Sequence, residues 1–209
     1  MLVKAIVLVR PRCPRRRLGG FTLIELMVTF VVVAVMLTLA APSFVTFQKN
    51  SQLRGAANAM LSAVTAGRAE AMKRQLNVYL RPGSPTAPSD DWAQGWYLYV
   101  DGNWDHVYSS DAASQDVLLS TQDALPPGVV AQSKDYVASD GTSHFIAISG
   151  AGFAIDGGGA LLASQSISFT NGTDTRLLVI DGSGRLRVCV PPPGTPNSPA
   201  DPSCGVNQL

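Results

Sequence analysis

Arginines near the C-terminus are the side chains whose spacing most clearly suggests a chemical role. The run Gly184-Arg185-Leu186-Arg187 lies in a strand-like segment, and Arg176 lies in the segment before it. Side chains of a strand alternate between its two faces, so Arg185 and Arg187 are expected on one face and the residues between them toward the core. Neighbouring guanidinium groups suit phosphate. The alternative is a solvated strand face with the arginines paired to nearby aspartates.

Residues that enzymes and metal sites use are few and unsuitably spaced. His106 and His144 are the two histidines, and neither lies in a metal-binding spacing. The segment 101–105 begins like a calcium loop, but the sixth position is His106 instead of glycine and the twelfth is Ala112 instead of glutamate. No serine has an obvious base, and the glycines 157–159 open no helix that could hold a phosphate. The sequence therefore predicts no enzyme, no catalytic residue, no cofactor, no metal ion and no small-molecule substrate.

The charge of the chain is unevenly distributed. Sixteen basic and fifteen acidic residues give a formal net charge of +1, but six of the basic residues precede Gly19. Without them the chain has ten basic and fifteen acidic residues, a net charge of −5. Between Asp90 and Asp140 there are nine acidic residues and one lysine. Any nucleic-acid site must therefore be local.

A basic leader precedes a long apolar stretch. From Phe21 to Phe47 the only charged side chain is Glu25, and a helix over 21–47 is long enough to cross the roughly 30 Å hydrocarbon core of a bilayer. The leader, residues 1–20, contains no acidic residue, which predicts that it stays in the cytoplasm. Since small residues come before the apolar stretch, a cut after Gly20 would remove the leader and keep the span.

The junction Gly20-Phe21-Thr22-Leu23-Ile24-Glu25 resembles the processing site of type IV pilins and type II secretion pseudopilins. The resemblance implies that a membrane-embedded prepilin peptidase cuts after Gly20 and methylates the new amino terminus of Phe21. It also implies that Glu25 pairs with the terminal amine of a neighbouring subunit, and that Pro42 kinks the helix. A carboxylate in a membrane is usually functional. The alternative is that the first helical turn already tolerates Glu25 through the helix dipole.

The helix is predicted to continue beyond the apolar stretch to about Leu76. Apolar or small residues recur there at three- and four-residue spacing, which indicates one packed face: Leu53, Ala57, Met60, Val64, Gly67 and Ala71. Gly67 on this stripe predicts a close approach to a sheet. From Asn77 onward short strand-like segments alternate with turn signals, and the last three, 166–170, 175–180 and 185–190, predict a meander. The fold class is therefore α+β, a long N-terminal helix packed on an antiparallel sheet.

The C-terminal tail, residues 191–209, is rich in proline and serine and is not expected to form regular structure. It contains Cys204. With Cys13 removed in the leader, Cys189 and Cys204 remain in a compartment that permits oxidation. A disulfide between them is predicted, and two free thiols are the alternative.

The segment from Asn77 to Val190 resembles the domain shared by secretion pseudopilin H and the FimT/FimU minor pilins, and the G-R-x-R of 184–187 resembles the motif by which FimT-type minor pilins bind DNA. The resemblance implies a structural subunit of a type IV pilus or a type II secretion pseudopilus, whose partners are other pilins or pseudopilins. The alternative is a secretion pseudopilin H with no role in binding DNA.

Four regions follow: a cleaved leader over 1–20, a transmembrane and assembly helix over 21–47, a periplasmic α+β domain over 48–190, and the tail. The expected location is the bacterial inner membrane, crossed once, with the C-terminal domain in the periplasm, or the filament after assembly.

Overall fold

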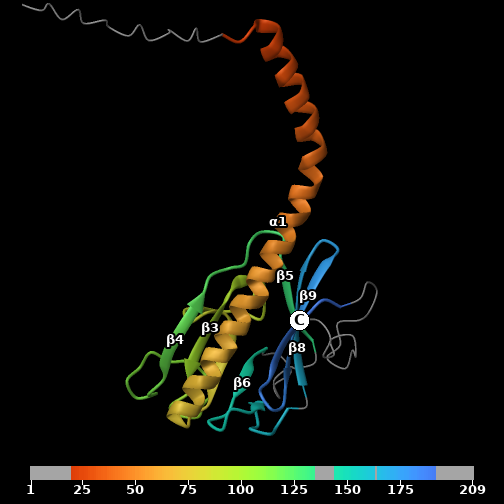
Figure 1. The fold of residues 1–209 in the computed structure, drawn as a ribbon. Coiled ribbons are helices and arrows are strands. Elements are labelled where there is room, and N and C mark those ends of the chain that lie inside the picture. The colour runs from red at the N-terminus through yellow and green to blue at the C-terminus, as the bar shows by residue number, and fades with distance from the viewer. Residues whose placement is uncertain (1–19, 135–143, 163, 192–209) are drawn as a thin grey trace, which may run out of the picture. The chain divides into compact units, whose positions relative to one another are not determined.

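The computed structural model describes residues 20–134, 144–162 and 164–191. Two compact units, Met1–Phe44 and Val45–Leu209, divide the chain. One helix, α1 (Leu23–Arg74), is assigned through the boundary between them (Figure 1). The predicted leader lies almost wholly outside the described residues.

The described part of the first unit is an apolar helix whose side chains are exposed. Every side chain from Phe21 to Thr38 is exposed, and Phe21 itself is 82% exposed. No single helix of the described residues is long and apolar enough to cross a membrane, although the segments Leu23–Thr38 and Ser43–Arg74 meet that test as a bent pair. The side chains of 39–42 lie outside the described part, so the kink at Pro42 stays a prediction.

In the second unit, α1 buries one face. All six residues of the predicted stripe are buried, and Leu53, Ala57 and Met60 are fully inaccessible. At Gly67 an added Cβ would lie 3.0 Å from Leu98 Cδ1. The helix and a sheet therefore meet closely at Gly67, as the sequence predicted. α1 ends at Arg74, two residues before the predicted end.

The first sheet has six antiparallel strands in the order β4-β3-β1-β6-β7, with β2 paired to the end of β1. The strands are β1 (Val78–Ser84), β2 (Ala87–Pro88), β3 (Trp96–Val100), β4 (Val117–Gln122), β6 (Ile146–Ile148) and β7 (Ala154–Ile155). A 3₁₀ turn, η1 (Trp92–Gln94), leads into β3. Proline and glycine at 82 and 83 do not end β1, because Pro82 pairs with Trp96 as part of this strand.

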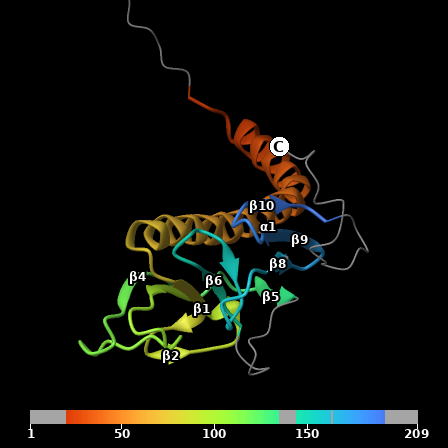
Figure 2. The ribbon, with the colours of Figure 1, turned by 90° about the horizontal axis from the view of Figure 1, so that it is seen from below.

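The second sheet has four antiparallel strands in the order β10-β9-β8-β5. The strands are β5 (Val130–Lys134), β8 (Ser164–Asn171), β9 (Asp174–Asp181) and β10 (Leu186–Cys189). Strands β8, β9 and β10 form the predicted meander. The predicted α+β fold, a long helix packed on antiparallel strands, is confirmed. The structure divides the strands between two sheets, and Figures 1 and 2 show both beside the second half of α1.

The two faces of the six-stranded sheet are filled differently. The face toward α1 carries the aliphatic residues Val78, Leu80, Leu98 and Val100, which join the helix stripe in one core. The opposite face carries a row of tyrosines, with ring centroids 5.7 Å apart for Tyr79–Tyr99 and 5.8 Å apart for Tyr97–Tyr99. Burial raises the pKa of both Tyr97 and Tyr99. This second face is therefore a packed aromatic layer and not a solvated surface.

Candidate processing site and arginine surface

The predicted processing junction lies just before the helix. Gly20 and Phe21 are exposed and outside regular structure, and nothing lies within 4 Å of a Cβ added at Gly20. Thr22 begins the helix: its Oγ1 accepts a hydrogen bond from Glu25 N at 3.3 Å, and its carbonyl accepts one from Leu26 N at 3.2 Å. The junction is therefore accessible in this structure, as a cleavage site must be.

Glu25 occupies the first turn of α1 and is exposed. Thr22 and Glu25 have the spacing of a capping box, in which the hydroxyl accepts from the third residue of the helix. A negative charge in the first turn also interacts favourably with the helix dipole. Glu25 thus has a local role within its own chain, and its pairing with a neighbouring subunit stays a prediction.

Arg185 lies in the turn between β9 and β10, and Arg187 lies on β10. Both are exposed, while Leu186 and Val188 between and beyond them are half-buried against the core. Arg185 N donates to Asp181 Oδ1 at 3.0 Å, and Arg187 lies opposite Val179 in the sheet. Exposed arginines therefore alternate with half-buried aliphatic residues, as the sequence predicted.

The backbone geometry before Arg185 explains why position 184 is a glycine. Gly184 has a φ of +76°, and an added Cβ would lie 2.4 Å from the Gly152 carbonyl oxygen. Arg68 of α1 donates from Nη1 to Gly184 O and from Nη2 to Ser183 O, each at 3.0 Å. The helix thus fixes the turn that presents Arg185, and only glycine fits this turn without strain.

Arg176 does not join the other two arginines. It pairs with Phe169 across β8, and Phe169 belongs to the core beneath α1. Since Arg176 and Val179 are three positions apart on β9, their side chains lie on opposite faces of the sheet. Arg176 Nη2 instead donates to Asn50 Oδ1 of α1 at 3.1 Å. The three-arginine cluster predicted from the sequence is therefore corrected to a pair, Arg185 and Arg187.

Arg176 has a different basic neighbour, which the sequence analysis missed. Arg54 and Asn58 of α1 line a pocket of about 250 Å³ with Arg176 and the end of β10. The sequence contained a pattern that indicates this neighbour: Asn50, Arg54 and Asn58 recur every fourth residue and so share one helix face.

Cys189 is buried on β10. Both Cys13 and Cys204 lie outside the described residues. The pairing of Cys189 with Cys204 therefore stays a prediction.

The loop that resembled a calcium site is held by its own backbone. Asp101 is buried, and its two carboxylate oxygens accept from Trp104 N at 2.7 Å and His106 N at 3.1 Å. In the part of the chain that the structure describes, no group of three or more His, Cys, Asp or Glu residues could hold a metal ion.

Comparison with protein families gives two matches. The family described as "Type II transport protein GspH" matches residues 56–184, and the prokaryotic N-terminal methylation motif matches residues 15–41. No curated protein matches the chain.

Solved structures resemble the chain at low identity. The type IV minor pilin FimU of Pseudomonas aeruginosa is 14% identical, with a TM-score of 0.48 over 70% of this chain and 98% of that one. The minor pseudopilin EpsH from the type 2 secretion system of Vibrio cholerae is 10% identical, with a TM-score of 0.45 over 68% of this chain and 98% of that one.

Proposed function

This chain belongs to the GspH family of type II transport proteins, and from that premise we propose that it is a structural subunit built into the filament of a type IV pilus or of a type II secretion pseudopilus. Its partners in the filament are other pilins or pseudopilins. Its working parts are the N-terminal helix, as the assembly surface, and the α+β domain that the helix carries.

The observation that carries this proposal is the exposed apolar surface of the first half of α1. Large apolar side chains are exposed in the described segments 21–38 and 43–47, and Glu25 is the one charged residue between Phe21 and Phe47. A continuous apolar surface of this kind marks a membrane or protein interface. A pilin-like subunit has both, because its helix lies in the membrane before assembly and among neighbouring helices afterwards.

The match to the N-terminal methylation motif covers the junction and supports processing there. A prepilin peptidase cuts after Gly20 and methylates the amine of Phe21. The protein then crosses the inner membrane once, with residues from Gln48 onward in the periplasm.

Exchanging Glu25 tests the filament role. Glu25→Gln keeps the shape of the side chain and removes the charge, so we expect a protein that is still inserted and cleaved but is at least several-fold depleted from sheared filaments. The matched control is Thr38→Ala, because Thr38 Oγ1 donates only to Val35 O of its own helix, at 2.7 Å. Equal amounts of Glu25→Gln and wild type in the filament fraction would leave Glu25 with its helix-capping role alone.

Binding of double-stranded DNA is a second candidate function, and the exposed pair Arg185 and Arg187 favours it. Two phosphate contacts give a log–log salt slope of about −1.8, at roughly −0.9 per contact. The two arginines can contact the phosphate backbone, but they do not distinguish one base sequence from another. We therefore expect weak binding without sequence preference.

A gel shift at low salt tests DNA binding by the full-length protein in detergent. The double variant Arg185→Ala with Arg187→Ala should lose binding, whereas the charge-matched variant Lys73→Ala with Arg74→Ala should keep it. Absence of wild-type binding would favour a secretion pseudopilin with no DNA role.

A further inference from the structure

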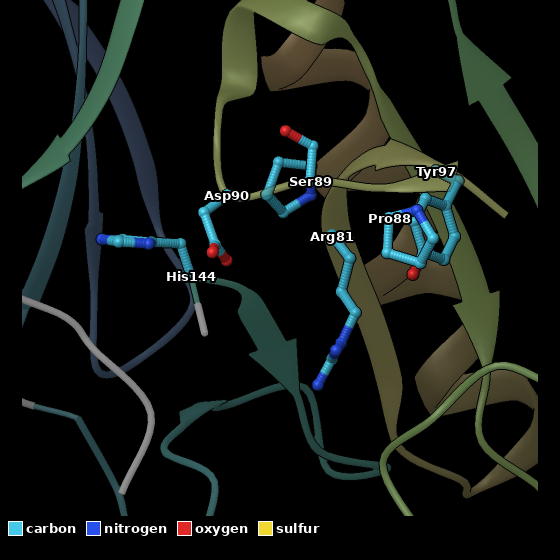
Figure 3. Close-up of a pocket in the computed structure, with 7 residues that line it drawn as sticks. Arg81, Pro88, Ser89, Asp90, Tyr97 and His144 are labelled. Atoms are coloured by element: carbon cyan, nitrogen blue, oxygen red, sulfur yellow. The ribbon is translucent and has the colours of Figure 1, made fainter. Parts of the chain in front are cut away.

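A second pocket lies on the tyrosine face of the six-stranded sheet, the face that turns away from α1. Its volume is about 180 Å³, and Arg81 of β1 and Tyr97 of β3 form one wall. These two residues are paired in the sheet and share the face of Tyr79, so the pocket lies at the end of the aromatic row. Figure 3 shows Arg81 and Tyr97 in the wall of the pocket. Neither the proposed filament role of α1 nor the arginine pair uses this pocket.

Arg81 has an unused donor in this pocket. Its guanidinium carbon lies 5.4 Å from the centre of the Phe145 ring, a distance at which the ring face attracts a cation. Its Nε is buried and has no hydrogen-bond partner. Buried N–H donors are nearly always paired in native proteins. A hydrogen-bond acceptor from another molecule would satisfy the Arg81 Nε–H.

The other walls define which acceptor fits. His144 lines the pocket, and its Nδ1 is also buried without a partner. Pro88 and Tyr97 also line the pocket, and the Tyr97 hydroxyl is a hydrogen-bond partner of the Arg81 side chain. Asp90 is exposed at the rim and turns its carboxylate toward the pocket, as Figure 3 shows. Its negative charge disfavours a doubly charged anion more than a singly charged one.

A carboxylate meets these conditions. Its two oxygens match the planar fork of a guanidinium, it carries one negative charge, and its methylene groups pack on proline and tyrosine. The pocket volume suits one side chain and leaves no room for a folded segment.

We propose that this pocket binds a carboxylate of a neighbouring polypeptide, either an acidic side chain or a chain terminus, with Arg81 as its principal partner. The inference rests on the proposed function, because a filament subunit has polypeptide neighbours. It adds a specific contact of the α+β domain to the assembly surface of the helix.

The test follows the Arg81 Nε–H signal by NMR in full-length protein labelled with ¹⁵N-arginine in detergent micelles. The probes are N-acetylglutamate amide for a side-chain carboxylate, N-acetylalanine for a chain terminus, inorganic phosphate, and neutral N-acetylglutamine amide. We expect a saturable shift of the Arg81 signal with at least one carboxylate probe and none with the neutral amide. The probe that binds more tightly identifies the source of the carboxylate.

Three variants sharpen the result. Arg81→Lys should weaken binding at least about tenfold, because the fork is lost. Asp90→Asn should tighten it about two- to fivefold by removing a nearby like charge. Arg74→Lys is the control and should change nothing, because Arg74 is paired with Glu70 on α1 at 2.8 Å.

Tighter binding of phosphate than of either carboxylate would overturn the proposed ligand class. An unsaturable shift, or one of equal size at Arg74, would overturn the site itself. An unchanged affinity in Asp90→Asn would contradict the placement of the ligand beside Asp90. The titration uses isolated protein and the filament assay uses cells, so either proposal can fail without the other.

Discussion

The two halves of α1 have opposite relations to the rest of the chain. From Phe21 to Thr38 every side chain is exposed, although nearly all are apolar. From Leu53 to Ala71 the helix is amphipathic, and one stripe is buried among the strands. The second half therefore gains its stability from its own chain, whereas the first half must gain it from a membrane or from other subunits.

This difference separates folding from assembly along a single helix. Changes to the buried stripe should lower the free energy of unfolding of the α+β domain. Changes of the same kind in the first half should leave that free energy unaltered and act only on insertion or incorporation. The predictions below compare matched substitutions on this basis.

The largest expected effect is that of Leu53→Ala. Leu53 is fully buried beneath the sheets, and such a truncation typically costs about 2–5 kcal/mol of unfolding free energy. Its counterpart, Leu37→Ala, removes an exposed side chain of the first half and should cost less than about 0.5 kcal/mol. Urea unfolding in detergent, followed by tryptophan fluorescence of the domain, measures both. Equal losses would show that the first half is also packed on the domain.

Gly67→Val should destabilise the domain by about 1–3 kcal/mol through overpacking. An added Cβ already lies 3.0 Å from Leu98 Cδ1 and 3.2 Å from Val78 Cγ1. The same substitution at Gly55, where nothing lies within 4 Å of an added Cβ, should change stability by less than about 0.5 kcal/mol. If both variants unfold at the same urea concentration, the close approach at Gly67 is wrong.

Arg68→Lys should cost about 1 kcal/mol, because a lysine ammonium lacks the planar fork that spans Ser183 O and Gly184 O. The control Arg54→Lys changes an exposed arginine of the same helix and should be neutral. The amide signal of Arg185 should also shift in Arg68→Lys, because the turn before it loses its support. An unchanged signal would mean that the turn holds without the helix.

The smallest effect concerns the ion pairs of Glu70. Hydrogen bonds from Arg74 and from Lys73 hold the pKa of Glu70 below its ordinary value of 4.5. Because the pKa is lower in the folded state, the stabilisation is complete above pH 4.5 and is lost as the pH falls through the lowered value. The stability difference between wild type and Glu70→Gln should therefore shrink in acid. Urea unfolding of both proteins between pH 3 and pH 7 checks this, and a difference that grows in acid would contradict it.

The sequence predicted the local features of the fold well. The stripe from Leu53 to Ala71 follows the helical period, and burial obeys that period wherever a helix packs on one side. The meander of β8, β9 and β10 was visible because glycine-containing turns separate its strands. The alternation of Arg185 and Arg187 with core residues follows from the two-residue period of a strand.

The features that the sequence did not predict depend on contacts between distant segments. Proline and glycine at 82 and 83 indicate a turn, yet β1 continues through them because Trp96 and Gly95 pair with them. The faces of Arg176 and Arg187 depend on the pairing register across the turn between β9 and β10, and a shift of one residue reverses every side chain. The pocket joins Arg81 to His144, which no local pattern connects.

The amino terminus of the mature protein tests the central claim most directly. Intact-mass and N-terminal peptide mass spectrometry of the membrane-extracted protein would identify it. The account predicts a chain that begins with N-methylated Phe21 and still contains the whole of α1. A chain that begins at Met1, or one that begins beyond Ala41 and so lacks the apolar half of the helix, would contradict the filament role.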